Sequence, residues 1–197
     1  SQNVGKGWAL RKGFELAIQY DYDYAITIDS DGQHFPSDLP LFLDKLNSIS
    51  PCLIIGSRNM NQSTVPGKSN FGNKFSNFWF LVETGINLTD TQSGFRLYPV
   101  KELSSMKFFT KKYEFEIEVI VRAAWKGIHI TSVPISVYYA PKEIRVSHFR
   151  PFKDFTRISL LNTVLVLIAI LYVYPKKAIQ SQKKKKTYLN IKDSLFN

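Results

Sequence analysis

Ile26-Thr-Ile-Asp-Ser-Asp-Gly-Gln-His34 joins a short apolar run to two carboxylates, a glycine, an amide and an imidazole. The apolar run has the composition of a buried strand, and the polar residues mark its exit. Side chains two positions apart on an extended strand point the same way, so Asp29 and Asp31 share one face. Two hard oxygen donors on one face suit Mg²⁺ or Mn²⁺ that carries a phosphate. The stretch predicts an enzyme with a phosphate-bearing substrate, although isolated acidic turns are common in proteins.

Helical and strand patterns alternate along the rest of the chain. The expected helices cover residues 8–20, 37–46, 71–82 and 115–125. The expected strands cover residues 24–29, 52–56, 128–133 and 135–139. Ser37 is a candidate N-cap, Gly85 and Gly127 are candidate helix stops, and Pro134 separates the last two strands. A polar loop covers residues 89–96. This alternation predicts an α/β layered domain with a mainly parallel sheet.

Basic charge is concentrated at the C-terminal end of this 197-residue chain, whose length fits one domain plus an appendage. Residues 1–141 hold 14 Lys or Arg against 13 Asp or Glu, net +1, whereas residues 142–197 hold 12 against 3, net +9. Such asymmetry is typical of a tail for nucleic acid or an anionic membrane. The lysine run at 183–186 lacks interleaved aromatic residues, which argues against nucleic acid. Cys52 is the only cysteine, so we expect a buried structural thiol and no disulfide.

Residues 158–174 form a run of 17 uncharged, mainly apolar residues. As a helix this run is about 26 Å long, slightly shorter than the hydrocarbon core of a bilayer. A core helix of the domain and a membrane-associated helix both fit the pattern, and we favour the membrane. Basic residues flank the run on both sides, so the positive-inside rule would keep both flanks in the cytoplasm. A tilted interfacial helix or a re-entrant element fits that charge pattern as well as a span does.

Four short motifs occur in an order and spacing that resemble family 2 glycosyltransferases, nearest to the dolichyl-phosphate mannose synthase and polyprenyl-phosphate glycosyltransferase group. The motifs are Asn3-Val-Gly-Lys-Gly7, Asp29-Ser-Asp-Gly-Gln-His34, Gly56-Ser-Arg58 and Asp90-Thr-Gln-Ser-Gly-Phe-Arg96. The resemblance covers residues 3–150 and rests on the ordered set, since no single motif is specific. It implies a GT-A fold, which is a nucleotide-sugar-binding α/β sandwich. It also implies transfer of a sugar from a nucleotide-sugar, often with inversion at the anomeric carbon.

By this resemblance, Asp29, Asp31 and Gln33 lie around a divalent metal, Mg²⁺ or Mn²⁺, and the sugar diphosphate. The chemistry agrees, because a metal held by carboxylates neutralises the charge that develops on a nucleoside diphosphate leaving group. Asp31 is therefore expected to act in catalysis as well as in metal binding. Gln33 would add a neutral oxygen ligand. For Gln33 and His34 the alternative is simple polarity at the entry to a helix, just before Pro36.

Three basic residues are candidates for substrate binding. Arg58 follows a strand and Arg96 follows Gly94, and a guanidinium can grip phosphate oxygens with two N–H groups. Lys6 lies between two glycines and resembles the family's loop beside the nucleotide. A surface ion pair is the alternative for Arg58.

Asp90 is the candidate catalytic carboxylate of the polar loop. If the acceptor is a sugar hydroxyl, an inverting reaction needs a general base to take its proton. If the acceptor is a lipid phosphate, the nucleophile is already anionic, and Asp90 would orient the donor or the acceptor instead. Capping of a turn is the structural alternative for Asp90.

Arg145 and Ser147 are expected to bind substrate, because they lie where the family carries a basic, small-polar loop that closes over the site. This chain departs from the commoner Ser-Lys pair there and has Ser147-His148. It also lacks the first strand and the acidic loop that hold the base and ribose in the family. We therefore expect either further sequence upstream of Ser1 in a longer gene product or a truncated copy of the domain.

The sequence predicts a GT-A domain over 1–150, a membrane-associated segment over 151–175 and a basic tail over 176–197. The predicted reaction moves a sugar from a UDP- or GDP-sugar to a polyprenyl-phosphate or another lipid-linked acceptor, with inversion. The expected partners are the nucleotide-sugar, the lipid phosphate and an anionic membrane surface at the cytoplasmic face. The alternatives are a transferase acting on a glycan hydroxyl and a non-catalytic membrane-tethered binding module.

Overall fold

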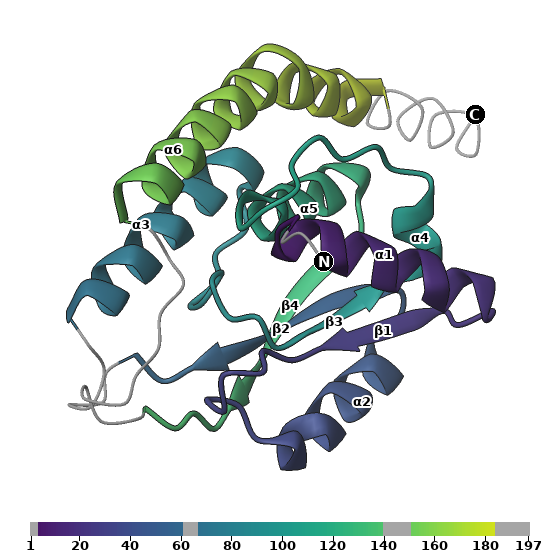
Figure 1. The fold of residues 1–197 in the computed structure, drawn as a ribbon. Helices are drawn as coiled ribbons and strands as arrows, with labels where there is room; N and C mark the ends of the chain where they lie inside the picture. Colours follow the sequence, from purple (N-terminus) through teal and green to yellow (C-terminus); the bar gives the residue numbers. More distant parts are fainter. Residues whose placement is uncertain (1–3, 61–66, 140–150, 184–197) are drawn as a thin grey trace.

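A computed structural model describes residues 4–60, 67–139 and 151–183 of the chain. Its centre is a sheet of four strands in the order β1-β3-β2-β4 (Figure 1). The strands are β1 (Tyr24–Thr27), β2 (Cys52–Arg58), β3 (Arg96–Pro99) and β4 (His129–Ile135). The helices are α1 (Lys6–Gln19), α2 (Leu39–Ser48), α3 (Gly67–Thr84), α4 (Val100–Ser104), α5 (Glu114–Lys126) and α6 (Pro151–Ile168).

Helices cover both faces of the sheet, with α2 on one face and α1, α3 and α5 on the other (Figure 1). Strand β2 alternates between the two cores, as an extended strand must. Leu53 and Ile55 pack into the core below α1, α3 and α5, whereas Cys52 and Ile54 pack with Phe42 of α2. The expectation of a buried structural thiol at Cys52 is confirmed by its exposed fraction of 0%. The fold is the predicted α/β layered class.

The sheet is mixed, which corrects the prediction of a mainly parallel one. Strand β3 runs antiparallel to both of its neighbours, and only β2 and β4 are parallel. The sequence pattern does not reveal β3, because the strand is only Arg96-Leu-Tyr-Pro99 and its first residue ends the polar loop expected over 89–96. A strand of four residues that starts with a charge carries almost no periodic signal.

Most element boundaries agree with the sequence patterns, with two local corrections. Helix α5 ends as predicted at Gly127, whose φ of 89° is a left-handed helix stop. Ser37 is not an N-cap, since it lies inside the 3₁₀ turn η1 (Pro36–Asp38), and α2 begins at Leu39 without a side-chain cap. The two strands expected over 128–133 and 135–139 are one strand, β4, which runs through Pro134 and ends at Ile135. In the described part of the sheet β4 is an edge strand, where a missing N–H is tolerated.

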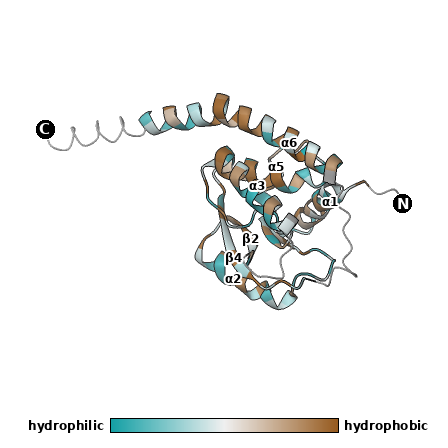
Figure 2. Cartoon of the chain, turned by 90° about the vertical axis from the view of Figure 1, so that its left-hand side faces the viewer, coloured by the Kyte–Doolittle hydropathy of each residue, from teal (hydrophilic) through white to brown (hydrophobic). Residues whose placement is uncertain are grey.

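Helix α6 continues through the π-helical turn η2 (Ala169–Val173) and lies across α3 and α5 (Figures 1 and 2). Within the described ranges one helix, Phe152–Lys183, has the length and apolar composition to cross a membrane. Only 22% of its most apolar window is buried, whereas the core helix of a soluble domain is mostly buried. Leu165 and Ala169 face the domain, while Leu160 and Leu171 are more than 60% exposed. The helix therefore covers the domain with one side and exposes apolar residues on the other.

Candidate functional site

Lys6 contacts the segment after β1, residues 28–34, which is called the acidic loop from here on. Two glycines allow this contact. Gly5 adopts a φ of 104° at the start of α1, a conformation that favours glycine. A Cβ on Gly7 would lie 2.4 Å from Cβ of Phe115, so only glycine lets α1 approach α5 this closely. Lys6 Nζ consequently lies 2.7 Å from Asp29 Oδ1 and 2.8 Å from Glu116 Oε2. Burial alone would lower the pKa of Lys6, but Glu116 and Asp29 raise it above its ordinary value.

Asp29 lies against the polar loop at Gly94. A Cβ on Gly94 would lie 2.2 Å from Asp29 Oδ2, so any side chain there would collide with the carboxylate. Thr27, the last residue of β1, donates from Oγ1 to the Gly94 carbonyl at 2.9 Å. The end of β1 and the loop after α3 therefore meet, with Asp29 against Gly94.

Asp31 is exposed, and its Oδ1 accepts the backbone N–H of Gln33 at 3.0 Å. The carbonyl of Gln33 in turn accepts the N–H of Tyr138. His34 is 8% exposed, and its ring packs 5.7 Å from that of Phe95. Burial is the main cause that lowers the pKa of His34. The side chain of His34 thus belongs to the packing beneath the loop, and Asp31 is the carboxylate that faces solvent.

Asp90 is the centre of a buried hydrogen-bond network. Its exposed fraction is 0%. Its Oδ1 accepts from the backbone N–H groups of Gln92 and Ser93 and from Asn73 Nδ2 of α3 at 2.7 Å. Arg58 adds its backbone N–H and two guanidinium contacts, at 2.6 Å to Oδ2 and 3.0 Å to Oδ1. Both oxygens are occupied by donors, so Asp90 fixes the loop to β2 and α3.

Arg96 holds the same loop through hydrogen bonds to backbone carbonyl oxygens. It is 0% exposed and donates to the carbonyl oxygens of Ser93, Thr91 and Glu116 at 2.6, 2.8 and 2.7 Å. The expected phosphate contact of Arg96 does not fit this burial, because its N–H groups already hold three carbonyls. Arg58, whose side chain is 10% exposed, is likewise engaged with Asp90. The two guanidinium groups position the loop in this structure.

Two residues of the site carried little signal in the sequence. Glu116, which looks like a solvated helix-face carboxylate, is 8% exposed and pairs with Lys6. Asn73 looks like an ordinary polar residue of α3, yet it is 2% exposed and bonded to Asp90. Tertiary contacts create both roles, so local patterns could not reveal them. Arg145 and Ser147 lie outside the described residues.

A divalent metal fits the acidic loop when a diphosphate completes its coordination. Asp29 Oδ1 is taken by Lys6, which leaves Oδ2, and Asp31 is exposed. Among residues 4–60, 67–139 and 151–183, no three His, Cys, Asp or Glu side chains group closely enough to enclose a metal. Mg²⁺ commonly takes one or two carboxylates and fills its shell with waters and substrate phosphates. The donor set of Asp29, Asp31 and Gln33 suits that kind of site.

Residues 1–104 match the family profile described as glycosyl transferase family 2. The UDP-N-acetylglucosamine–dolichyl-phosphate N-acetylglucosaminyltransferase of Methanococcus voltae is 30% identical over 84% of this chain and 69% of its own length. The undecaprenyl-phosphate mannosyltransferase of Micrococcus luteus is 29% identical over 67% of this chain and 56% of its own. The polyprenol monophosphomannose synthase of Mycolicibacterium smegmatis is 28% identical over 75% and 57%. The chain thus spans between half and about two thirds of these relatives.

Among solved structures, the chain resembles glucosyl-3-phosphoglycerate synthase from Mycobacterium tuberculosis in complex with phosphoglyceric acid. The TM-score is 0.57 at 18% identity, over 84% of this chain and 55% of that one. A second structure of that enzyme, with Mn²⁺ and UDP-glucose, gives a TM-score of 0.51. At this identity the likeness concerns the fold, and it confirms the GT-A prediction.

Proposed function

The chain belongs to glycosyltransferase family 2, and from that premise we propose that its whole protein transfers a sugar from a UDP- or GDP-sugar to a polyprenyl phosphate. The observation that carries the proposal is that Lys6 and the Gly94 loop both contact Asp29, two residues before the exposed carboxylate of Asp31. The names of three relatives, each a transferase acting on a polyprenyl or dolichyl phosphate, support this acceptor class.

In the proposed reaction, a phosphate oxygen of the lipid attacks the anomeric carbon of the sugar. The bond between that carbon and the diphosphate oxygen breaks, and its electron pair leaves with the nucleoside diphosphate. The product has the inverted configuration. Mg²⁺ or Mn²⁺, held by Asp31, Asp29 Oδ2 and Gln33, would neutralise charge on the leaving group when bound. Lys6 lies beside Asp29 and supplies a further positive charge to the same region.

A lipid phosphate also suits the burial of Asp90. A phosphate is anionic at neutral pH, so the reaction needs no general base. Asp90 is fully buried and accepts six hydrogen bonds, so it is poorly placed to take a proton from an acceptor hydroxyl. We propose that Asp90 contributes by holding Arg58 and the loop. Its bonds to the backbone N–H groups of Gln92 and Ser93 are those of the turn cap that the sequence allowed as the structural alternative.

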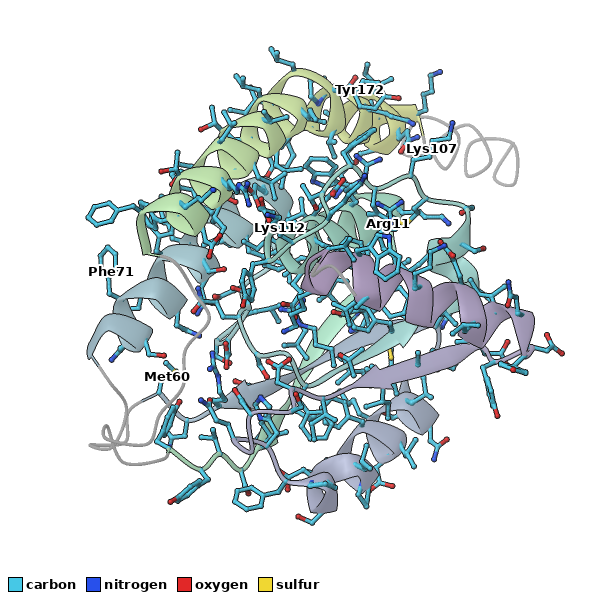
Figure 3. The ribbon with its side chains drawn as sticks, in the orientation of Figure 1. Arg11, Met60, Phe71, Lys107, Lys112 and Tyr172 are labelled. Atoms are coloured by element: carbon cyan, nitrogen blue, oxygen red, sulfur yellow. The ribbon has the colours of Figure 1, made fainter. Side chains whose placement is uncertain are left out.

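We also propose that the protein works at the cytoplasmic face of a membrane, with residues 1–150 as the catalytic domain and α6 as the element that meets lipid. The exposed apolar side of α6 and the basic residues at both of its ends support this position. Each Lys or Arg near an anionic surface contributes about 1 kcal/mol to the attraction. Phe71 of α3, at the left of the molecule, and Tyr172 of η2, at its top, are both exposed aromatic side chains (Figure 3).

The test uses the whole protein in membranes, supplied with UDP- and GDP-sugars, with and without Mn²⁺ and polyprenyl phosphate. The assay measures release of the nucleoside diphosphate. Release that needs both metal and lipid phosphate is the expected result and identifies the donor. Release that is equally fast without any lipid phosphate contradicts the proposed acceptor. No release with any donor, from protein that is folded, favours the non-catalytic binding module.

A further inference from the structure

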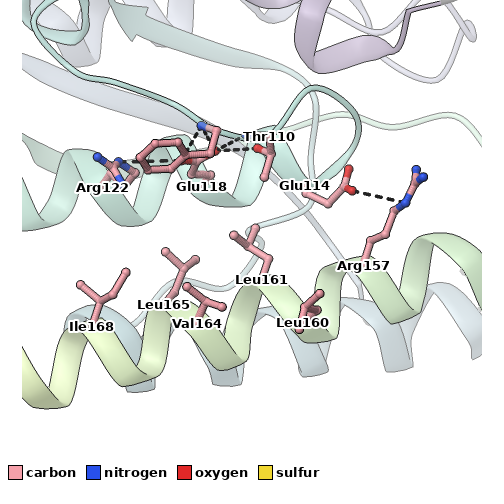
Figure 4. Close-up of a pocket in the computed structure, with 11 residues that line it drawn as sticks. Thr110, Glu114, Glu118, Arg122, Arg157, Leu160, Leu161, Val164, Leu165 and Ile168 are labelled. Atoms are coloured by element: carbon pink, nitrogen blue, oxygen red, sulfur yellow. Dashed lines mark hydrogen bonds and ion pairs between the residues drawn. The ribbon is translucent and has the colours of Figure 1, made fainter.

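An apolar slot of about 430 Å³ lies between α5 and α6 (Figure 4). Its volume is within the range of small-molecule pockets, roughly 300–1,000 Å³. Helix α6 lines the slot with successive apolar side chains. These are Leu160, Leu161, Val164, Leu165 and Ile168. Phe109 forms part of the opposite wall, so the lining suits a hydrocarbon.

Arg157 gives one end of the slot a positive charge that the protein satisfies poorly. Its Nε lies 3.9 Å from Glu114 Oε1, which is too long for a hydrogen bond. Its Nη1 is buried and has no hydrogen-bond partner among the described residues. Burying an N–H without an acceptor is unfavourable, and a guanidinium pairs well with phosphate oxygens. An anionic head group at this end would supply the missing acceptor.

The two ends of the slot are different. At the far end the Arg122 guanidinium lies 5.2 Å from the centre of the Phe109 ring. Its Nε is 3.9 Å from Glu118 Oε1 of the same helix and, like Arg157 Nη1, is buried without a hydrogen-bond partner among the described residues. Glu118 also accepts the backbone N–H groups of Phe109 and Thr110, which fixes that wall. The Arg157 end instead meets the first turn of α5. That turn carries both Glu114, which faces Arg157, and Glu116, which binds Lys6 of the site.

The slot also opens toward the outside of α6. Leu160 and Val164 line it and are 66% and 45% exposed. A hydrocarbon chain could therefore enter from the lipid that we propose α6 contacts, without crossing water. The slot thus connects an apolar exterior with the turn of α5 that supports the acidic loop.

We propose that this slot holds the hydrocarbon chain of the lipid-phosphate acceptor, with Arg157 near its phosphate. The proposal rests on the proposed function for the identity of the lipid, and it adds a place for the chain. Three observations carry it: Arg157 Nη1 lacks an acceptor at the end beside the first turn of α5, α6 gives the slot an apolar wall, and the slot opens toward the membrane side.

The test is saturable binding of radiolabelled farnesyl phosphate to the whole protein in nanodiscs, with no nucleotide-sugar present. Val164→Trp fills the slot and should weaken binding by at least about tenfold. Ile170→Trp is the matched control, because Ile170 is 54% exposed in η2, directly after α6, and does not line the slot. This control should stay within about twofold of the wild type. Thermal unfolding of both variants shows that they are folded. Equal binding by Val164→Trp and the wild type would overturn the slot.

The head-group contact is tested with Arg157→Gln and with farnesol, which has the same chain without phosphate. We expect weaker binding of farnesyl phosphate and unchanged binding of farnesol. A parallel loss of both ligands, or no loss of either, contradicts the contact with Arg157. Binding without any sugar transfer would sink the proposed function and leave the slot standing. If Val164→Trp changes neither sugar transfer nor lipid binding, the slot is contradicted and the proposed function stands.

Discussion

The loop around Asp90 and the layer between α3 and α6 differ in whether their buried polar groups have hydrogen-bond partners. Asp90 is fully buried and accepts six hydrogen bonds from three parts of the chain. Glu83 of α3 is also 0% exposed, yet neither carboxyl oxygen has a hydrogen-bond partner among the described residues. The same holds for Asn162 Oδ1 of α6 and Trp79 Nε1 of α3. The buried carboxylate of the loop therefore has all its hydrogen bonds from the protein, whereas the helix layer contains buried polar atoms without a partner among the described residues.

This difference predicts a rigid loop and a helix layer whose stability depends on pH and on its surroundings. A buried network with every member satisfied fixes one arrangement, which a site for a diphosphate needs. A buried polar group without partners makes an interface sensitive to protonation and to its surroundings. The helix layer is also where apolar side chains are exposed, such as Leu171 at 74% and Phe152 at 92%. The domain thus presents a fixed site and a helix layer suited to contact with lipid.

Removing the carboxylate of the satisfied network should have the largest effect. Asp90→Ala leaves Arg58 and Asn73 buried without their acceptor, so we expect a loss of about 3–5 kcal/mol in the free energy of unfolding. Denaturant unfolding measures this loss. Asp44→Ala, at an exposed position of α2, is the control and should change little. Equal stability of the two variants would mean that the network around Asp90 contributes nothing.

Glu83 should make the stability of the protein depend on pH. Burial raises the pKa of Glu83 from 4.5 to about 8. Between these values the folded protein binds a proton that the unfolded chain has released, so stability falls as pH rises. The loss is on the order of 3 kcal/mol across this window. Glu83→Gln removes the titrating group and should flatten this part of the curve. Thermal unfolding between pH 5 and pH 8 makes the comparison, and parallel curves for variant and wild type contradict the protonated carboxyl.

Gly94→Ala should damage the site more than the fold. The new Cβ would displace the Asp29 carboxylate, which is about one third exposed and can move aside. We expect a stability loss of about 1 kcal/mol together with a large loss of donor-dependent turnover. Gly13→Ala is the control, since a Cβ there meets nothing within 4 Å and α1 gains a better helix former. Turnover of Gly94→Ala at the wild-type rate would show that the position of Asp29 is unimportant.

The sequence was sufficient for the features that depend on local pattern. Asp29 and Asp31 were candidates because their spacing places two carboxylates on one face of a strand, and Lys6 was a candidate because the Gly-Lys-Gly segment resembles the family's loop. Arg96 and Asp90 were also singled out, but their burial depends on β3 and α3 packing around the loop, which no local period encodes. The pairing of Lys6 with Glu116 needs α1 and α5 to approach each other at Gly7. Strand β3 was missed for a related reason, because its place in the sheet comes from pairing with β1 and β2.

The central claim is that the exposed carboxylate Asp31 holds the metal and the diphosphate, while buried Asp90 holds the loop. The most direct test is the Mn²⁺ dependence of nucleoside diphosphate release by the whole protein, compared between wild type, Asp31→Asn and the control Asp44→Asn. We predict that Asp31→Asn lowers kcat/KM by at least about 100-fold and leaves the unfolding transition unchanged, while Asp44→Asn behaves as wild type. Release by Asp31→Asn at the wild-type rate, with the same Mn²⁺ dependence, would contradict the account.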